Sequence, residues 1–164
     1  VDLKKFRDKF IMQLEMSHKN APYKQETLSY IDEVLGYKGS LISELASNSI
    51  EIFFSFMNIE KRFLKSSKNF PCSKGLEKTK RLISITKELE SKNYVNAIGG
   101  ISLYKKDEFL NEDVSLKFLK SNFINYRHCN TDKSVFFEGL SIIDLMMNLS
   151  KDELNNYLNS YNLI

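Results

Sequence analysis

Basic side chains gather at the start of a segment whose apolar spacing predicts a helix over Leu76 to Glu90. They are Lys74, Lys78, Lys80 and Arg81. The amides at a helix N-terminus are already positive, so each exposed cation there costs about 0.3–1 kcal/mol. A bound phosphate or carboxylate would reverse that sign, which predicts an anion site. The alternative is a solvated basic surface with Glu77 and Glu88 as partial partners.

Two adjacent glycines, Gly99 and Gly100, follow the segment Tyr94 to Ile98, which is predicted to be a short enclosed strand. A helix, an apolar strand and a glycine-rich turn form the mouth of ligand crevices in α/β proteins, because ligands bind outside the carboxyl ends of the strands. The amides of the glycines could line a phosphate pocket, or the pair could be a simple tight turn. The pattern is neither G-x-G-x-x-G nor a P-loop, so it is a weak nucleotide signature.

Polar loops follow three predicted strands, Arg62 to Ser66, Tyr94 to Ile98, and Val114 to Phe118. If the strands are parallel neighbours, these loops meet along one edge of the sheet and surround a ligand. The alternative is that the loops are polar only because loops are solvated. The residues expected to orient a ligand here are Ser66, Ser67 and Asn96.

The chain has two histidines, His18 and His128. His128 adjoins Cys129, but adjacent side chains on an extended segment point to opposite faces, so the two cannot pair directly as nucleophile and base. Asp144 fits the capping-box pattern that begins at Ser141, and this position explains its carboxylate without catalysis. No residue is therefore predicted as base or nucleophile. With two histidines and no clustered carboxylates, no metal site is predicted.

Residues 1–58 are predicted to be helical throughout, because apolar residues recur at intervals of three and four. Gly36 is expected as a left-handed C-cap, and Ser40 as the N-cap of the helix that follows. The run Ile50 to Phe56 also has strand propensity. Helix is favoured there because no breaker separates the run from Leu45.

Residues 60–120 alternate predicted strands and helices, which implies parallel pairing with right-handed crossovers. Residues 140–162 are predicted to be helices, with start signals at Ser141 and Ser150. The expected fold is α/β, a small parallel sheet flanked by helices and preceded by a helical N-terminal segment. Together these stretches are expected to form a single domain, 1–164.

Composition limits the classes of function. A length of 164 residues, 42% of them apolar and 27% charged, suits one folded domain. A net charge of +3 permits an anionic ligand but is unlike the dense basic stripe of nucleic-acid binders. Cys72 and Cys129 lie far apart without CxxC spacing, so no disulfide framework is indicated. No apolar run approaches the roughly 18 residues of a membrane span, and no signal peptide is evident, so a reducing, cytoplasmic setting is expected.

The order of several short motifs resembles the WbqC-like family, bacterial proteins often encoded in O-antigen and other surface-polysaccharide clusters. The motifs span nearly the whole chain: Ala21-Pro22-Tyr23, Ser66-Ser67, Lys78 to Leu89, Tyr94 with Gly99-Gly100, Leu103-Tyr104, Phe109, and Leu140 to Leu145. By this resemblance the chain corresponds to the C-terminal part of the family, without the family's usual opening. It departs from the family pattern at Glu90-Ser91-Lys92 and at Arg127-His128.

The resemblance implies an enzyme of surface-polysaccharide biosynthesis that acts on a nucleotide-linked sugar, with transfer of an acyl or aminoacyl group. The alternative is a non-catalytic binding or assembly protein of the same pathway. The expected partner is an anionic small molecule such as a sugar nucleotide, and no residue pattern indicates a cofactor. The expected ligand-binding residues are Ser66, Ser67, Lys74, Lys78, Arg81, Asn96, Gly99, Gly100 and Tyr104.

Overall fold

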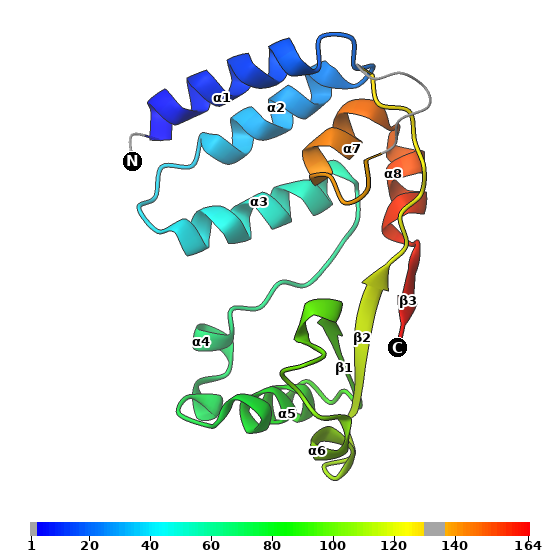
Figure 1. Cartoon of the computed structure of the whole chain (residues 1–164). Helices are drawn as coiled ribbons and strands as arrows, with labels where there is room; N and C mark the ends of the chain where they lie inside the picture. Colours follow the sequence, from blue (N-terminus) through cyan, green and yellow to red (C-terminus); the bar gives the residue numbers. More distant parts are fainter. Residues whose placement is uncertain (1–2, 130–136) are drawn as a thin grey trace. The chain divides into compact units, whose positions relative to one another are not determined.

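The computed structural model describes residues 3–129 and 137–164 (Figure 1). Its contacts divide the chain into two compact units. The first, called the helical unit, comprises Val1–Lys61 and Phe123–Asn159. The second, called the sheet unit, comprises Arg62–Asn122 and Ser160–Ile164. Each unit is described by itself.

Three helices open the helical unit, as the apolar periodicity predicts. They are α1 (Leu3–Ser17), α2 (Lys24–Leu35) and α3 (Ile42–Phe56), and α2 packs against both of the others (Figure 1). The run Ile50 to Phe56 lies entirely within α3, so the preference for helix over strand is confirmed. The strand propensity of these residues did not determine their secondary structure. Phe53 is buried in the core of the unit, which the helical spacing allows.

Two predicted helix ends differ from the structure. Gly36 is the C-cap of α2, but its φ of −73° is right-handed, so the expected left-handed cap is wrong. A Cβ at Gly36 would lie 3.0 Å from the Asp32 carbonyl oxygen, so the glycine is favoured by close backbone approach. Leu41 holds the N-cap position of α3, so Ser40 is not the cap.

The C-terminal part of the helical unit contains α7 (Ile142–Asn148) and α8 (Lys151–Leu158). Ser150 and Glu153 form the predicted capping box, because each side chain bonds the backbone N–H of the other. Met146 and Leu154 pack with Phe53 in one core cluster. Met147, on the same helix as Met146, packs with Leu28 of α2 in a second cluster. Thus α7 is fixed on two sides.

The sheet unit contains a small mixed sheet, which confirms the α/β class. Strand β1 (Asn93–Ala97) pairs in parallel with β2 (Ser115–Ser121), and β3 (Tyr161–Leu163) pairs antiparallel with β2. The helices of this unit are α4 (Ser66–Asn69), α5 (Lys78–Glu88) and α6 (Lys106–Leu110), with short 3₁₀ turns η1 (Pro71–Ser73) and η2 (Ile98–Gly100) (Figure 1).

The core of the sheet unit lies between its strands and the helices α5 and α6. Leu116 and Phe118 alternate along the inner face of β2, and they pack with Ile83 and Phe109. The predicted alternation of Val114, Leu116 and Phe118 is therefore confirmed, since all three are buried. The helix predicted over Leu76 to Glu90 is also present, although it begins at Lys78.

Two segments of the sheet unit are not what the pattern predicts. The segment Arg62 to Ser66 is not a strand, because residues 62–65 have no regular structure and Ser66 begins α4. Residues 161–163 form β3, although residues 140–162 were expected to be helical. Among the described residues, β1 and β2 are the only parallel neighbours. The expected convergence of three polar loops after three parallel strands is therefore wrong at Ser66 and Ser67.

Within the residues that the structure describes, no helix combines the length and the apolar character needed to cross a membrane.

Candidate functional site

Asp144 lies in the first turn of α7, in the helical unit. The N-cap of this helix is Ser141, whose hydroxyl accepts a hydrogen bond from the Ile143 amide at 3.3 Å. The Asp144 carboxylate does not complete a capping box at Ser141, as Glu153 does at Ser150, but bonds three side chains from distant segments. The local explanation of Asp144 predicted from the sequence is therefore wrong.

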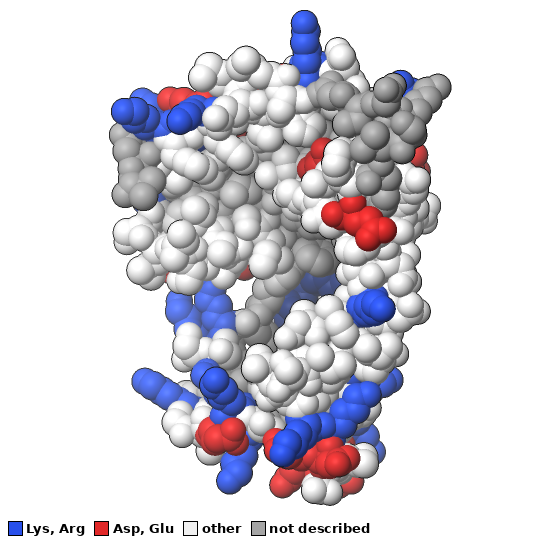
Figure 2. All heavy atoms as spheres, in the orientation of Figure 1, with Lys and Arg blue, Asp and Glu red and all other residues white. Residues whose placement is uncertain are grey.

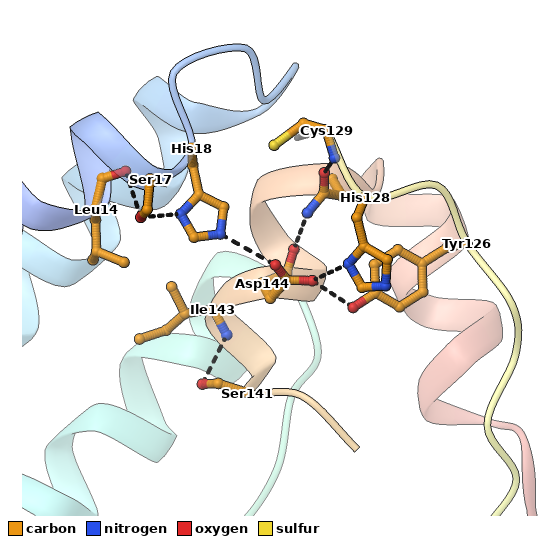
Figure 3. Close-up of polar contacts among 10 residues, drawn as sticks. Leu14, Ser17, His18, Tyr126, His128, Cys129, Ser141, Ile143 and Asp144 are labelled. Atoms are coloured by element: carbon orange, nitrogen blue, oxygen red, sulfur yellow. Dashed lines mark hydrogen bonds and ion pairs between the residues drawn. The ribbon is translucent and has the colours of Figure 1, made fainter. Parts of the chain in front are cut away.

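Three ring groups surround the Asp144 carboxylate (Figure 3). His18 Nε2 lies 3.1 Å from Oδ1. The Tyr126 hydroxyl lies 2.5 Å from Oδ2, and His128 Nδ1 lies 3.1 Å from the same oxygen. We call these four residues the Asp144 cluster.

The chain brings the Asp144 cluster together from three places. His18 follows directly after α1, and the Ala21 amide bonds its carbonyl in a tight turn. Tyr126 and His128 are two residues apart in a segment without regular structure, and both reach Oδ2. Asn148 of α7 holds that segment in place, since it accepts from the Cys129 amide and donates to the Asp144 carbonyl, both at 2.8 Å.

The cluster is largely removed from solvent. The exposed fractions of the side chains are 18% for Asp144, 15% for His18 and 6% for His128. Burial raises the pKa of the Tyr126 hydroxyl far above its ordinary value, and its hydrogen bond with Asp144 raises it further. Tyr126 is therefore protonated and donates to the carboxylate. An ionised carboxylate only accepts, so the ring nitrogens of both histidines that face it carry hydrogens.

This assignment fixes what the outer nitrogen of His18 can do. When Nε2 of a neutral imidazole carries the hydrogen, Nδ1 is an acceptor. The Ser17 hydroxyl lies 2.8 Å from His18 Nδ1, and Ser17 is exposed (Figure 3). A carboxylate, an imidazole and an exposed hydroxyl thus form one chain of hydrogen bonds. Such a chain can accept a proton at His18 Nδ1 and stabilise the resulting imidazolium through Asp144.

In residues 3–129 and 137–164, no group of three or more His, Cys, Asp and Glu side chains could hold a metal ion. Both histidines instead direct a ring nitrogen at the same carboxylate. The cluster is therefore suited to proton transfer.

In the helical unit, a groove and a smaller cavity are lined by described residues of α7. A groove of about 680 Å³ is lined by parts of α2, α3, α7 and α8, including Tyr30, Phe56 and Met146, but Asp144 does not line it. A smaller cavity of about 300 Å³ is lined by Tyr126 and Asn148, both of which contact Asp144. Of these two, the smaller cavity adjoins the Asp144 cluster.

The sheet unit contains all nine ligand-binding residues predicted from the sequence. One hydrogen bond joins two of them, because Arg81 Nη2 donates to the Ser66 hydroxyl at 3.2 Å. Arg81 Nε also lies 3.4 Å from the hydroxyl of Ser73, which is buried and donates to the Phe70 carbonyl. The guanidinium thus joins α5 to the segment that contains α4 and η1. Ser67, the second residue of α4, is exposed.

A carboxylate of the chain itself caps the start of α5, where the sequence predicts an anion site. Glu77 is the N-cap residue, and its side chain accepts a long hydrogen bond of 3.5 Å from the Thr79 amide. Lys74 is the C-cap of η1 and Lys78 begins α5, and both are exposed. On the face drawn in Figure 2, basic and acidic side chains are interleaved over the sheet unit. An anion at this helix end would compete with Glu77.

Asn96 and the two glycines form a local structure after β1. The Asn96 side-chain oxygen accepts from the Ala97 amide at 2.8 Å, and its amide nitrogen lies 2.7 Å from where a Cβ of Gly100 would be. Gly100 thus makes room for Asn96. A Cβ at Gly99 would meet open space. Both glycines lie in η2, so the predicted tight turn after the strand is present.

Tyr104, the last of the predicted residues, packs in the core of the sheet unit. Its ring meets Phe109 edge-on, with centroids 6.2 Å apart, and Phe109 also stacks on Tyr94. The described contacts therefore bring together Ser66 with Arg81, and Asn96 with Gly100, as two separate groups.

The sequence alone does not predict the Asp144 cluster, and the reason is physical. His18 and Asp144 are 126 residues apart, and no local spacing shows that they meet. A usable signal was the alternation of Tyr126 and His128, because side chains two apart on an extended segment share a side. Those two residues and His18 are all able to donate to a carboxylate.

Comparison with known proteins gives one result. Residues 1–156 match the family model described as the WbqC-like protein family. Neither the curated proteins nor the solved structures that were compared with the chain include a match.

Proposed function

The chain belongs to the WbqC-like protein family, and we propose that it is an enzyme of bacterial surface-polysaccharide (O-antigen) biosynthesis. In this proposal it transfers an acyl or aminoacyl group to a nucleotide-linked sugar. The observation that supports catalysis is the contact of His18 Nε2 with the Asp144 carboxylate, at 3.1 Å, which leaves His18 Nδ1 as a proton acceptor.

The proposed chemistry is general base catalysis. As the amine or hydroxyl of the sugar attacks the acyl carbon, it must lose a proton, and His18 Nδ1 accepts it. Asp144 stabilises the imidazolium, while Tyr126 and His128 hold the carboxylate in position by donating to its other oxygen. The proton then passes from His18 to the leaving group of the donor. A positioned base of this kind contributes about 10²–10⁴-fold to the rate.

A separate proposal concerns the phosphates of the nucleotide. Lys74, Lys78 and Arg81 would hold them by charge, with the amides of Gly99 and Gly100 lining the pocket. Ser66, Ser67, Asn96 and Tyr104 would orient the ligand. The support is the basic start of α5 together with the position of the Arg81 guanidinium, which already spans two hydroxyls. A phosphate would replace hydroxyl contacts with stronger charged ones.

We also propose that the protein acts in the cytoplasm. The two cysteines lie far apart without the spacing of a disulfide framework, which is typical of proteins from reducing compartments.

The test of catalysis is a transfer assay on the purified chain. A panel of nucleotide-linked amino sugars is mixed with acyl and aminoacyl thioesters, and products are detected by their mass. His18→Gln and Asp144→Asn are expected to slow transfer by about 10²-fold or more. Asp152→Asn, an exposed residue in the first turn of α8, is the matched control and is expected to retain the parent rate. Equal rates in all four proteins would reject the base.

The test of phosphate binding is isothermal titration with the same sugar nucleotides. Arg81→Glu reverses a charge within the proposed site, and Lys92→Glu makes a similar change at an exposed position before β1. We expect the first to weaken binding and the second to leave it nearly unchanged. If Arg81→Glu binds as tightly as the parent, the basic segment is only surface.

The second candidate is a non-catalytic binding or assembly protein of the same pathway. It is favoured if the contacts of Asp144 are structural rather than catalytic. One carboxylate with three donors joins three distant segments and so stabilises the fold. The two candidates differ in one outcome. A binding protein would hold a sugar nucleotide in the titration but give no product in the transfer assay, and His18→Gln would alter only its stability.

A further inference from the structure

Ser17 has the geometry of a nucleophile in the Asp144 cluster. Its hydroxyl lies 2.8 Å from His18 Nδ1, the nitrogen that the Asp144 contact leaves as an acceptor. Ser17 is exposed, whereas His18 is only 15% exposed and Asp144 only 18%. The proton relay therefore runs from the interior to a single hydroxyl at the surface.

The order of these contacts is that of a serine, histidine and aspartate triad. In such triads the hydroxyl donates to one ring nitrogen, while the other nitrogen donates to a buried carboxylate. In the serine protease triad, histidine Nε2 faces the serine and Nδ1 faces the aspartate. Here the two nitrogens are exchanged, with Nδ1 toward the serine and Nε2 toward the aspartate. Triads are recognised by roles and geometry rather than by sequence order, so this sense of the ring is compatible with the chemistry.

The residues around Ser17 and His18 hold the two side chains in positions suited to proton transfer. Ser17 is the last residue of α1, and its hydroxyl also lies 3.3 Å from the Leu14 carbonyl. The shorter contact, with His18 Nδ1, is the better hydrogen bond. Asp144 is fixed in turn by Tyr126 and His128, so the imidazole meets an oriented carboxylate.

From this geometry, and resting on the proposed acyl transfer, we propose that Ser17 is the nucleophile and that transfer passes through an acyl group on its hydroxyl. The donor is an activated ester or thioester. In the first step, Ser17 Oγ attacks the acyl carbon and its proton moves to His18 Nδ1. A C–O bond forms, the bond from carbon to the leaving oxygen or sulfur breaks, and the leaving group takes the proton from His18.

The second step returns the enzyme to its starting state. The amine or hydroxyl of the acceptor attacks the acyl carbon and gives its proton to His18 Nδ1. The bond from carbon to Ser17 Oγ breaks, and Oγ takes the proton back. The acyl group is thereby moved from donor to acceptor with no oxidant or reductant, and each proton is accounted for at His18.

The experiment uses p-nitrophenyl acetate as an acyl donor that needs no specific recognition. Wild-type protein is expected to release a burst of p-nitrophenolate stoichiometric with protein. Mass spectrometry of the quenched protein should find one acetyl group, on a peptide that contains Ser17. Ser17→Ala should lose both signals. Ser49→Ala is the matched control, because the Ser49 hydroxyl, like that of Ser17, lies close to the carbonyl three residues before it in a helix but does not contact a histidine in the described contacts.

Two further variants make the result independent of folding defects. His18→Gln should slow the burst by about 10²-fold or more, while the acetyl group still appears on Ser17. Ser17→Cys should recover the burst, with the acetyl group as a thioester at the same position. Circular dichroism during heating checks that each variant is folded.

The outcomes separate this inference from the proposed function. If Ser17→Ala still transfers an acyl group in the sugar-nucleotide assay while His18→Gln does not, the base is correct and the covalent step is wrong. If both variants keep the parent rate, both proposals are wrong. A wild-type protein that gives no acetyl group on Ser17, or an acetyl group elsewhere that Ser17→Ala does not remove, also overturns the nucleophile.

Discussion

The two units of this chain treat polar side chains in opposite ways. In the helical unit, one carboxylate gathers a tyrosine and two histidines from segments far apart in the sequence. In the sheet unit, the conspicuous basic residues lie near one another in sequence, and the described contacts of Arg81 are with neighbouring serines. A polar group is costly to bury without partners, so the buried cluster is the more constrained of the two. Residues that look functional in a sequence are those that are close together along the chain. Residues that contact one another in the fold can be far apart along the chain.

The largest expected effect is that of Asp144→Ala. Removing the carboxylate leaves three donors without their acceptor, which should lower the free energy of unfolding by about 3 kcal/mol. Urea denaturation measures this. The matched control is Asp152→Ala in the first turn of α8, where an exposed carboxylate is worth about 0.3–1 kcal/mol. A loss at Asp144 no larger than at Asp152 would mean that the cluster is not a stabilising network.

Tyr126→Phe should have the next largest effect. The hydroxyl donates to an ionised carboxylate, and such a bond contributes about 2 kcal/mol. Tyr30→Phe is the comparison, because that hydroxyl donates to the uncharged Ser49 carbonyl at 3.1 Å and should be worth about 1 kcal/mol. Equal losses would show that the charge on Asp144 adds nothing to its contact with Tyr126.

Ser150→Ala should cost about 1 kcal/mol near neutral pH by removing the capping box of α8. The Ser150 side chain lowers the pKa of Glu153, and the Ser150 amide lowers it further. A lowered folded-state pKa means that the stabilisation is complete above the unfolded pKa of about 4.3 and is lost as pH falls through the folded value.

The pH dependence supplies the check on this cap. In urea denaturation at a series of pH values, the difference between Ser150→Ala and the parent should be steady from neutral pH down to mildly acid pH. It should then shrink as Glu153 becomes protonated. A difference that grows with acidity would contradict the sign of the pKa shift.

The smallest effect is expected in the turn after β1. Gly100→Ala places a Cβ against the Asn96 amide, which must move from its rotamer at a cost of about 0.5–1.5 kcal/mol. Gly99→Ala meets open space and should stabilise slightly, by about 0.4–1 kcal/mol, because it reduces the freedom of the unfolded chain. Thermal unfolding should therefore rank Gly99→Ala above Gly100→Ala. The double variant Asn96→Ala with Gly100→Ala should recover the loss if the contact is its cause.

The sequence predicts the elements of this fold better than their contacts. Periodicity correctly indicates helix at Ile50 to Phe56, and alternation correctly indicates the inner face of β2 at Leu116 and Phe118. The short apolar run Phe63-Leu64 fails as a strand signal, since two apolar residues in a polar context fit many structures. Strand β3 was missed because its pairing with β2 is a long-range contact.

The candidate site was harder to predict than the fold. The capping-box pattern at Ser141 explains Asp144 as a local helix cap. The sequence therefore gives no reason to predict Asp144 as a site residue. Ser141 does cap α7, so the pattern was half correct, but the carboxylate turns to His18, Tyr126 and His128. In the sheet unit, the basic cluster was visible in sequence, while the Glu77 cap and the Arg81 contacts with Ser66 and Ser73 were not.

The most direct test of the account is the tautomer of each histidine, which determines whether His18 Nδ1 can accept a proton. Nitrogen-15 labelling of histidine gives a simple NMR spectrum, because the chain has two histidines. At mildly alkaline pH we predict that His18 carries its hydrogen on Nε2 and His128 on Nδ1, and that Asp144→Asn disturbs both patterns. If His18 instead carries its hydrogen on Nδ1, or if Asp144→Asn changes neither ring, Asp144 does not organise the site and the proposed base is wrong.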